Sequence, residues 1–338
     1  MTRTTATATA TGTAERGPGG RAFRADDGAA GEAVSAAGRP APRAALAAGL
    51  GAFLFWGHAP IYWKLLSAAG AAEVIAHRVC WAFAFLGLYL LIRHRRRVLA
   101  HARIPRRVAF ALMLSGALVA VNWLVFVYAV NSERVLSTSL GYFINPLVSV
   151  LLGSLVLGER MVGGQRIAVV LAAAGTLYLT VRVGEPPWLA LALAFSFGLY
   201  GLVRKVTDVG PMVGLFWETL MMTPIALGWL AWSAPSDRLV FGDLGTVHDL
   251  LLIGTGLVTV IPLVLFATAA RGLPLITIGV MQYLAPSISF CLAVFLYDES
   301  FTPDHAVAFG AIWTALALYT AVGWHRMRHQ RRLAREPG

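Results

Sequence analysis

Polar side chains recur along one face of a stretch of the chain that is otherwise apolar. Thr138, Tyr142, Asn145 and Ser149 are spaced by three or four residues, which places them on one stripe of an α-helix. Polar groups are costly in lipid, so a membrane helix turns such a stripe toward protein or water. Pro146 cannot donate to the carbonyl of residue 142, so we expect a kink that leaves an acceptor beside the stripe. These groups are suited to hydrogen-bonding a solute inside a membrane protein.

Further side chains in apolar stretches could line a cavity between helices. Aromatic rings could form a wall for an amphipathic solute, and amides could hydrogen-bond it. Packing between helices, interfacial belts and inter-helix hydrogen bonds are the alternative uses of the same side chains. The candidate substrate-binding residues are Trp56, Tyr62, Arg78, Asn122, Trp123, Tyr142, Asn145, Tyr200, Gln282 and Tyr283.

Charged side chains within apolar stretches are more pointed evidence, because Arg or Asp at a bilayer centre costs at least about 2.5–3.5 kcal/mol. Arg78 and Glu218 are the candidates, and Lys64 is weaker because it can reach the headgroups from its helix end. We predict that Glu218 carries a coupling proton, since desolvation of an unpaired carboxylate favours its neutral form. The alternative is a permanent ion pair between Glu218 and Arg78, whose expected depths differ by roughly 11 Å.

The polar stripe has a second copy later in the chain. Residues 275–299 match residues 135–159 at a constant shift of 140, and residues 197–205 match residues 56–64 at a shift of 141. Pro146 and Pro286 are therefore predicted to kink two pseudo-symmetric helices. The aligned pairs include Tyr142 with Gln282, Pro146 with Pro286, Ser149 with Ser289, Glu159 with Glu299, Gly57 with Gly198, and Lys64 with Lys205.

Composition sets the class of protein. Hydrophobic residues make up 57% of the 338 residues and charged residues 13%, and the mean hydropathy is +0.67. Soluble domains have about 45–50% apolar and 25% charged residues, so this composition indicates a polytopic membrane protein. Cys80 and Cys291 lie in apolar stretches, which favours buried free thiols over a disulfide or a metal site. We expect no metal and no cofactor.

Ten apolar runs follow residue 44, each about 20 residues long and able to cross about 30 Å of hydrocarbon. An odd number of crossings in each half inverts the second half relative to the first. The sequence thus predicts an all-α polytopic membrane protein, with ten transmembrane helices in two inverted five-helix repeats. We expect a disordered tail at 1–42, repeats at 43–183 and 184–325, and a basic tail at 326–338. The predicted spans are 44–66, 73–92, 108–130, 135–157, 165–182, 187–204, 211–232, 247–270, 275–297 and 305–324.

Arginines indicate the orientation in the cell (inner) membrane. They crowd the connection at 93–107 and the C-terminal end, and by the positive-inside rule both lie in the cytoplasm, together with the N-terminus. The formal net charge of +11 then reflects orientation and attraction to anionic lipid, so no nucleic-acid partner is expected. The expected partners are the lipid bilayer and a small-molecule substrate, and the oligomeric state stays open.

Several segments closely resemble the EamA group of the drug/metabolite transporter superfamily. They include Phe-Trp-Gly at 55–57, Glu-Val-Ile-Ala-His-Arg at 73–78 and Asn-Trp-Leu-Val-Phe at 122–126. Others are Ser-Leu-Gly-Tyr-Phe-Ile-Asn-Pro-Leu at 139–147, Phe-Gly-Leu-Tyr-Gly-Leu-Val-Arg-Lys at 197–205 and Gln-Tyr-Leu-Ala-Pro at 282–286. The resemblance covers nearly everything after about residue 44 and implies ten helices in two inverted halves and export of small metabolites or drugs.

Three classes of function are compatible with a polytopic membrane protein. The repeat, the expected kinks and the lack of a phosphate-binding loop motif favour a secondary transporter, or permease, with alternating access between the halves. An intramembrane enzyme is not expected, because no His-Glu-x-x-His or Gly-x-Ser-x-Gly motif occurs. The alternative is a channel-like or structural membrane protein without coupled transport, which would show neither saturation nor exchange.

Overall fold

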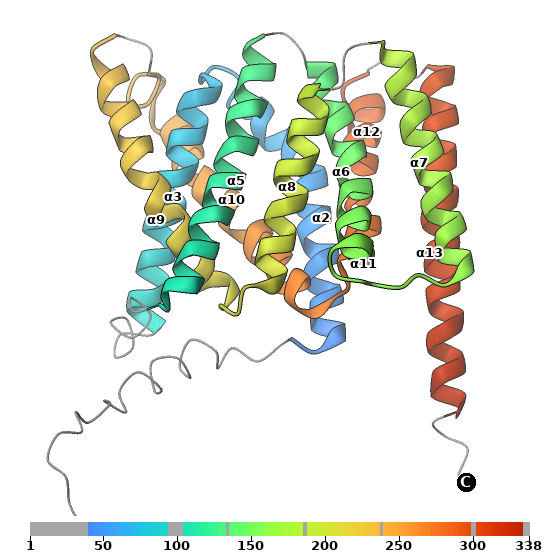
Figure 1. Ribbon diagram of the computed structural model, residues 1–338. Coiled ribbons are helices and arrows are strands. Elements are labelled where there is room, and N and C mark those ends of the chain that lie inside the picture. The colour runs from blue at the N-terminus through green and yellow to red at the C-terminus, as the bar shows by residue number, and fades with distance from the viewer. Residues whose placement is uncertain are drawn as a thin grey trace, which may run out of the picture.

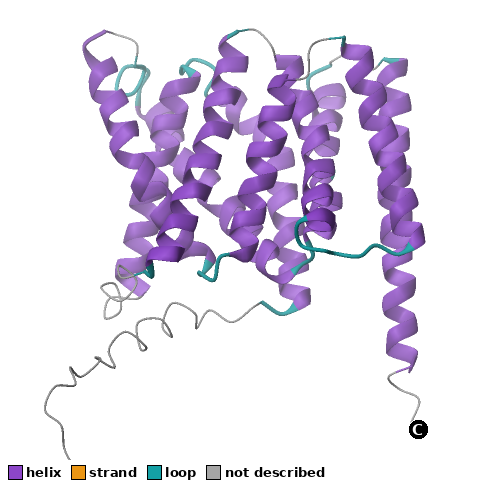
Figure 2. Ribbon diagram, viewed as in Figure 1, coloured by secondary structure: helices purple, strands orange, loops and turns teal. Residues whose placement is uncertain are grey.

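The computed structural model describes residues 40–93, 104–132, 135–184, 188–236, 239–298 and 302–333. The predicted tail at 1–42 lies almost wholly outside these residues, as do Glu299 and the end of the basic tail. Within them the regular structure is helical, as Figures 1 and 2 show. The helices are α2 (Pro42–Leu65), α3 (Ala71–Arg93), α5 (Arg106–Asn131), α6 (Val135–Leu155), α7 (Gly163–Val183), α8 (Trp188–Val206), α9 (Pro211–Ser233), α10 (Thr246–Gly272), α11 (Leu275–Gln282), α12 (Leu284–Leu296) and α13 (Pro303–Leu333), with a short 3₁₀ turn at Ala234–Ser236.

These helices have the length and composition of membrane spans. Nine helical stretches of the described residues are long and apolar enough to cross a bilayer. The assessed part of α6, Gly141–Leu155, is shorter, and the whole helix has 21 residues. The observed bounds agree with the predicted spans to within a few residues, except that α13 continues to Leu333, into the segment predicted as a basic tail. An all-helical polytopic membrane fold is thereby confirmed.

One span is broken, and its counterpart is continuous. The helical run from Leu275 is interrupted at Tyr283, three residues before Pro286, and resumes as α12. A proline ring disfavours helical geometry in the turn that precedes it, which explains the position of the break. Pro146 lies inside α6, which is assigned as a helix throughout its length.

The helices pack as matched pairs. α2 packs on α10 and α12, while α8 packs on α5 and α6. α3 lies against α9 and α10, α6 lies against α11, and α7 pairs with α13 at the edge of the bundle, as Figure 1 shows. The larger core lies between the helices of the two halves and contains a group of stacked and tilted rings: Phe53, Trp56, Phe197, Tyr200 and Phe266.

Two glycines allow two of these contacts. A Cβ atom on Gly57 of α2 would lie 2.7 Å from the Cβ atom of Ile288 in α12. A Cβ atom on Gly198 of α8 would lie 2.7 Å from a methyl carbon of Val148 in α6. Both helix pairs therefore approach too closely for any larger residue at these positions.

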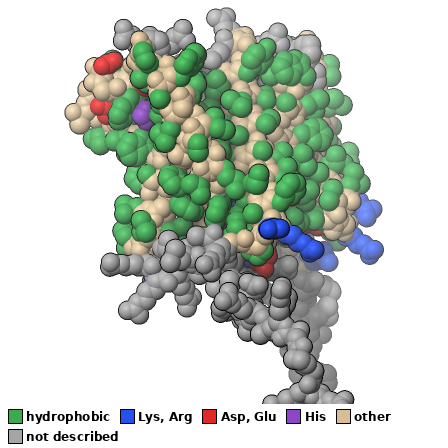
Figure 3. Space-filling view, turned by 60° about the vertical axis from the view of Figure 1, so that its left-hand side comes forward, with side chains coloured by type: hydrophobic (Ala, Val, Ile, Leu, Met, Phe, Trp, Pro, Cys, Tyr) green, Lys and Arg blue, Asp and Glu red, His purple; other side chains and the backbone are tan. Residues whose placement is uncertain are grey.

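The start of α2 and the end of α13 lie at the same end of the bundle, drawn at the bottom of Figure 1. We call this the terminal end and the other the opposite end. The Lys and Arg side chains visible in Figure 3 gather toward the terminal end. On the face shown in Figure 3, the basic side chains thus lie nearer the terminal end.

Candidate functional site

Arg78 is the centre of an aromatic cluster inside the bundle. Its guanidinium carbon lies 4.9 Å from the ring centre of Trp63 and 4.6 Å from that of Trp123. Its Nε donates a hydrogen bond of 3.0 Å to the hydroxyl of Thr259. Tyr142 is close enough to interact with it electrostatically. We call these five residues the Arg78 cluster, to which α2, α3, α5, α6 and α10 each contribute one side chain.

The hydroxyl of Thr259 fixes how the guanidinium is presented. It donates its own proton to the carbonyl of Thr255, at 2.8 Å, so its lone pair accepts from Arg78. With Nε engaged, the edge formed by Nη1 and Nη2 stays available. This is the edge with which arginine binds carboxylates and phosphates through two parallel hydrogen bonds.

Within the part of the chain that the structure describes, the Arg78 side chain has no acidic partner. Among the described residues no carboxylate lies within ion-pair distance of it, and Nη1 and Nη2 have no hydrogen-bond partner. Cation–π contacts contribute about 0.5–2 kcal/mol each and leave the charge of the guanidinium uncompensated. The cluster therefore holds a cation with unused donors.

One ring of the Arg78 cluster is exposed at the surface of the protein. Tyr142 is 53% exposed, although it lies next to Arg78. Arg78 and Trp63 are themselves only partly buried, whereas Trp123 is 9% exposed and packs into the core. A small solute could thus contact the guanidinium and three aromatic rings.

The stripe on α6 continues from Tyr142 toward the terminal end. The Asn145 Oδ1 atom is buried without a hydrogen-bond partner among the described residues. One turn further, Ser149 donates to Gln282 Oε1 at 3.1 Å, and Nε2 of Gln282 is likewise buried and unpartnered. Buried polar atoms are normally satisfied, so these two are additional places where a ligand or water could bind. The side chain of Thr138 lies outside the described residues.

Glu218 has a different partner from the one considered from the sequence. Its Oε1 lies 3.4 Å from Nη1 of Arg204, and both side chains are only 1% exposed. Ser115 donates to the same carboxylate at 2.5 Å, and Tyr200 donates to it at 3.4 Å. The pair with Arg78 is therefore wrong, and so is the premise that Glu218 lacks a close partner. Its role as a proton carrier stays a prediction.

Five other predicted site residues are not members of the Arg78 cluster, although the ring of Tyr62 packs edge-on against Trp63 at 5.5 Å. Trp56 and Tyr200 belong to the aromatic core. Asn122 ties α5 to α8 by donating to the Leu193 carbonyl and the Ser196 hydroxyl, at 2.9 and 3.0 Å. The hydroxyl of Tyr62 donates to a backbone carbonyl of α10. Tyr283 is buried and its hydroxyl shares a hydrogen bond with Thr176.

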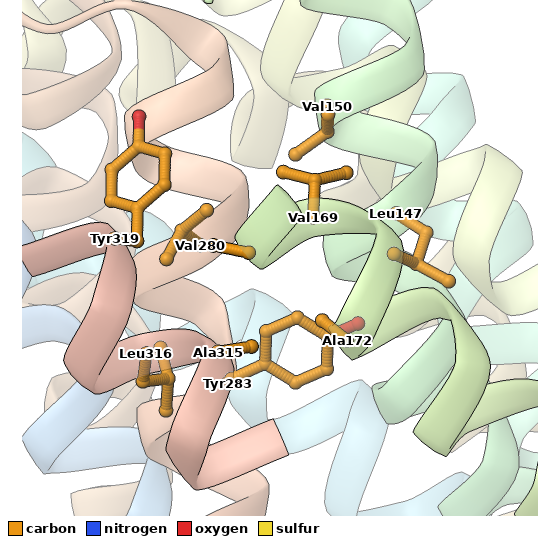
Figure 4. Close-up of a pocket in the computed structure, with 10 residues that line it drawn as sticks. Leu147, Val150, Val169, Ala172, Val280, Tyr283, Ala315, Leu316 and Tyr319 are labelled. Atoms are coloured by element: carbon orange, nitrogen blue, oxygen red, sulfur yellow. The ribbon is translucent and has the colours of Figure 1, made fainter. Parts of the chain in front are cut away.

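A small apolar pocket lies elsewhere, between α6, α7, α11 and α13. Figure 4 shows its lining, in which the ring of Tyr283 points in among aliphatic side chains. It offers no charged group and hardly any polar surface, so it is a packing defect beside the break in the ninth span. We place the candidate site at the Arg78 cluster instead. The pocket is lined by Leu147, Val150, Ala168, Val169, Ala172, Val280, Tyr283, Ala315, Leu316 and Tyr319.

Sequence reasoning missed Trp63 and Thr259. Trp63 precedes Lys64 near a helix end, where a tryptophan usually belongs to the interfacial belt. Thr259 follows Thr255 by four residues, and hydroxyls in membrane helices commonly bond only to their own backbone. The repeat could have drawn attention to Trp63, because the shift of 141 aligns it with Arg204, a basic residue of the second half.

Comparisons with known proteins are consistent with this fold. The profile described as the EamA-like transporter family matches residues 43–181 and again 187–321. Protein RarD of Streptomyces exfoliatus is 42% identical over 294 residues, covering 86% of this chain and 91% of that protein. An uncharacterized transporter of Vibrio cholerae is 43% identical over 275 residues, with 81% and 91% coverage. Protein RarD of Escherichia coli is 42% identical over 271 residues, with 80% and 91% coverage.

One solved structure shares the architecture. It is a crystal structure of a protein with 19% sequence identity, and it superposes with a TM-score of 0.66 over 83% of this chain and 99% of that chain. At this identity the likeness concerns the fold alone.

Proposed function

Because this chain belongs to the EamA-like transporter family and is a membrane transporter, we propose that it is a secondary transporter that exports small metabolites or drugs. The observation that carries the proposal is the Arg78 cluster. It combines a cation that lacks a carboxylate partner among the described residues with aromatic side chains from three helices, and α10 of the second half completes a site that otherwise belongs to the first. A solute bound there would contact both halves, as alternating access requires.

Alternating access between inverted halves, 43–183 and 184–325, is supported by the packing. If α2, α3, α5 and α6 correspond to α8, α9, α10 and α11–α12, two of the contacts between the halves have counterparts: α2 with α12 matches α8 with α6, and α2 with α10 matches α8 with α5. Gly57 and Gly198 occupy matching positions in these contacts. The family profile also matches twice, once in each half.

A carboxylate clip at the terminal end supports a conformation closed on that side. Glu159, in the turn after α6, accepts hydrogen bonds from the backbone N–H groups of Leu275 and Ile276, at 2.7 and 2.9 Å. These are the first residues of α11, where the helix dipole favours an anion. Lys205 of the second half lies 3.6 Å from the same carboxylate and also donates to the Leu273 carbonyl. The clip joins the two halves beneath the α6 stripe.

We place both termini in the cytoplasm of a bacterial inner membrane. The support is the positive-inside rule, since Arg106, Arg107, Arg160, Arg166 and Arg271 all belong to connections or helix ends at the terminal end. In this orientation the clip closes the cytoplasmic side, which supports an outward-facing state.

Transport is tested in proteoliposomes loaded with unlabelled compound. A carrier takes up labelled compound at a rate that saturates, and the unlabelled compound inside the vesicles accelerates this uptake by counterflow. A channel shows neither behaviour. The compounds come from a growth screen of an overproducing strain on amino acids, analogues and antibiotics, in which export appears as raised tolerance. Unchanged tolerance to every compound together with absent counterflow would contradict the proposal.

A further inference from the structure

The Arg78 cluster has a chemistry that selects among small solutes. We propose that its ligand is an organic monocarboxylate with a flat, apolar body, bound end-on by Nη1 and Nη2 of Arg78 between the rings of Trp63 and Trp123. This inference rests on the proposed function, because it assigns a substrate class to the same site. It adds the charge, the binding edge and the shape of the solute.

The charge follows from what surrounds the guanidinium. Arginine stays protonated even when it is buried, and inside a bilayer its charge is costly unless an anion accompanies it. The described part of the chain supplies no carboxylate that forms an ion pair with Arg78, whereas Arg204 has such a partner in Glu218. One guanidinium balances one negative charge, so a monoanion completes the site without leaving a net charge behind.

The binding edge follows from Thr259. Its hydroxyl occupies Nε at 3.0 Å and holds the side chain from the α10 side. A carboxylate that binds in the cluster meets the remaining pair of N–H donors, whose spacing matches its two oxygens. The hydroxyl of Tyr142, on the exposed side of the cluster, offers a further donor to the same group.

The flat shape proposed for the ligand follows from the aromatic side chains around Arg78. Trp63, Trp123 and Tyr142 are the side chains in contact with or beside the cation, and all three are planar aromatic groups. Offset or edge-to-face packing of a ligand ring against such walls adds about 0.5–1.5 kcal/mol beyond the area buried. No carboxylate stands in the cluster to receive an ammonium group, so a zwitterion gains less from this site than a simple acid does.

The test uses three ligands that share a phenyl ring and differ at the other end: phenylacetate, phenylacetamide and phenylalanine. Binding to the detergent-purified full chain is measured by quenching of tryptophan fluorescence and by calorimetry. We expect phenylacetate to bind about 10- to 100-fold more tightly than phenylacetamide, since the ionised group makes charge-assisted hydrogen bonds. Equal binding of the acid and its amide overturns the inference, and tighter binding of phenylalanine replaces the simple acid with a zwitterion.

Substitutions of Arg78 test whether the preference for the acid over the amide arises at this residue. Arg78→Gln should abolish the preference for the acid over the amide while the protein stays folded, and Arg78→Lys should keep part of the preference because it retains the charge without the fork. Arg166→Gln, at an exposed position of α7, is the matched control and should bind like the wild type. An unchanged preference in Arg78→Gln contradicts the assignment even if the ligand binds.

Binding and transport are read separately, so the two proposals can fail separately. Selective binding of phenylacetate without counterflow would leave the ligand class intact and remove the transport proposal. Counterflow of other compounds, with no preference for the carboxylate in binding, would support the transport proposal and remove the proposed ligand class. Loss of folded Arg78→Gln protein would shift the decision to the wild-type comparison of acid and amide, which needs no variant.

Discussion

The two halves of the molecule each hold an arginine in the membrane, and they treat it differently. In the second half, Arg204 of α8 pairs with Glu218 of α9. In the first half, Arg78 of α3 lies over Trp63 of α2. The shift of 141 aligns Trp63 with Arg204, and the shift of 140 aligns Arg78 with Glu218. Matching positions thus carry an ion pair in one half and an arginine–tryptophan contact in the other.

This difference shows that the neighbouring helix decides the use of a buried charge. A carboxylate on the neighbour ties the charge into the fold, as Ser115 and Tyr200 help to do around Glu218. An aromatic ring on the neighbour supports the guanidinium without consuming its donors, so the charge stays available to a solute. Five predictions would break or sharpen this comparison.

The largest effect is expected from breaking the ion pair. Glu218→Ala leaves the buried Arg204 uncompensated and should lower the free energy of unfolding by about 3–5 kcal/mol. Thermal unfolding and the yield of folded protein in detergent measure this. The double variant Glu218→Gln with Arg204→Met has neither charge, so it should recover most of this lost stability. A well-folded Glu218→Gln protein that binds substrate and lacks only proton-driven transport would instead support the proton-carrier hypothesis.

The next effect comes from making the first half resemble the second. Trp63→Glu supplies Arg78 with a carboxylate, so binding of a carboxylate ligand and transport should fall about 10- to 100-fold while the protein stays folded. Trp63→Gln is the control for loss of the ring and should fall less. Identical losses in the two variants would mean that the charge of Arg78 is irrelevant to the ligand.

The third prediction concerns contacts that the halves share. Gly57→Val and Gly198→Val should each destabilise the protein by about 1–3 kcal/mol, because the new side chains overlap Ile288 and Val148. Gly310→Val, in α13, has nothing within 4 Å of the added Cβ atom and serves as the control. Very unequal losses at Gly57 and Gly198 would argue against equivalent contacts in the two halves.

A smaller effect is expected at the carboxylate clip. Glu159→Gln keeps an acceptor and removes the charge, so we expect a loss of about 1 kcal/mol from the helix N-terminus. Amide hydrogen exchange at Leu275 and Ile276 should become faster, since these N–H groups have lost a strong acceptor. Asp243→Asn, in an exposed loop, is the control. Unchanged exchange would show that the clip contributes nothing.

The smallest effect is expected at the prolines. Pro286→Ala should reduce the transport rate more than Pro146→Ala, because only the span with Pro286 is broken. Each variant can regain one backbone hydrogen bond, so stability should change by about 1 kcal/mol or less. Initial transport rates normalised to folded protein provide the measurement. Wild-type rates in both variants would remove the role proposed for the kinks.

The spans could be predicted from the sequence, because hydropathy is a local property of the chain, while the role of Arg78 in binding stays a prediction. The partner of Glu218 could not. Arg204 lies next to Lys205 at a helix end, where a basic residue is expected to mark the cytoplasmic side. Its complete burial follows from the way α8 and α9 pack, which no local pattern reveals.

The candidate site was predictable only in part for the same reason. Tyr142 of the α6 stripe and Trp123 of α5 both lie beside Arg78, and their roles in binding stay predictions. Tyr200 and Asn122 have the same residue types as good ligand contacts, yet they satisfy partners within the fold. Which of two polar residues faces a neighbour and which faces a hollow depends on helix rotation, and a rotation of one residue changes the answer.

The spacing of the two ion sites along the chain also bears on how the protein is made. Arg204 and Glu218 lie on consecutive helices joined by a short turn, so the hairpin of α8 and α9 can enter the bilayer with its charges already neutralised. Arg78 is anchored by Thr259, 181 residues later, and no hairpin partner neutralises it. The hydrogen bond from Arg78 can therefore form only after α10 has been made. The residue assigned to the solute is thus also the last of the two arginines to reach its native contacts.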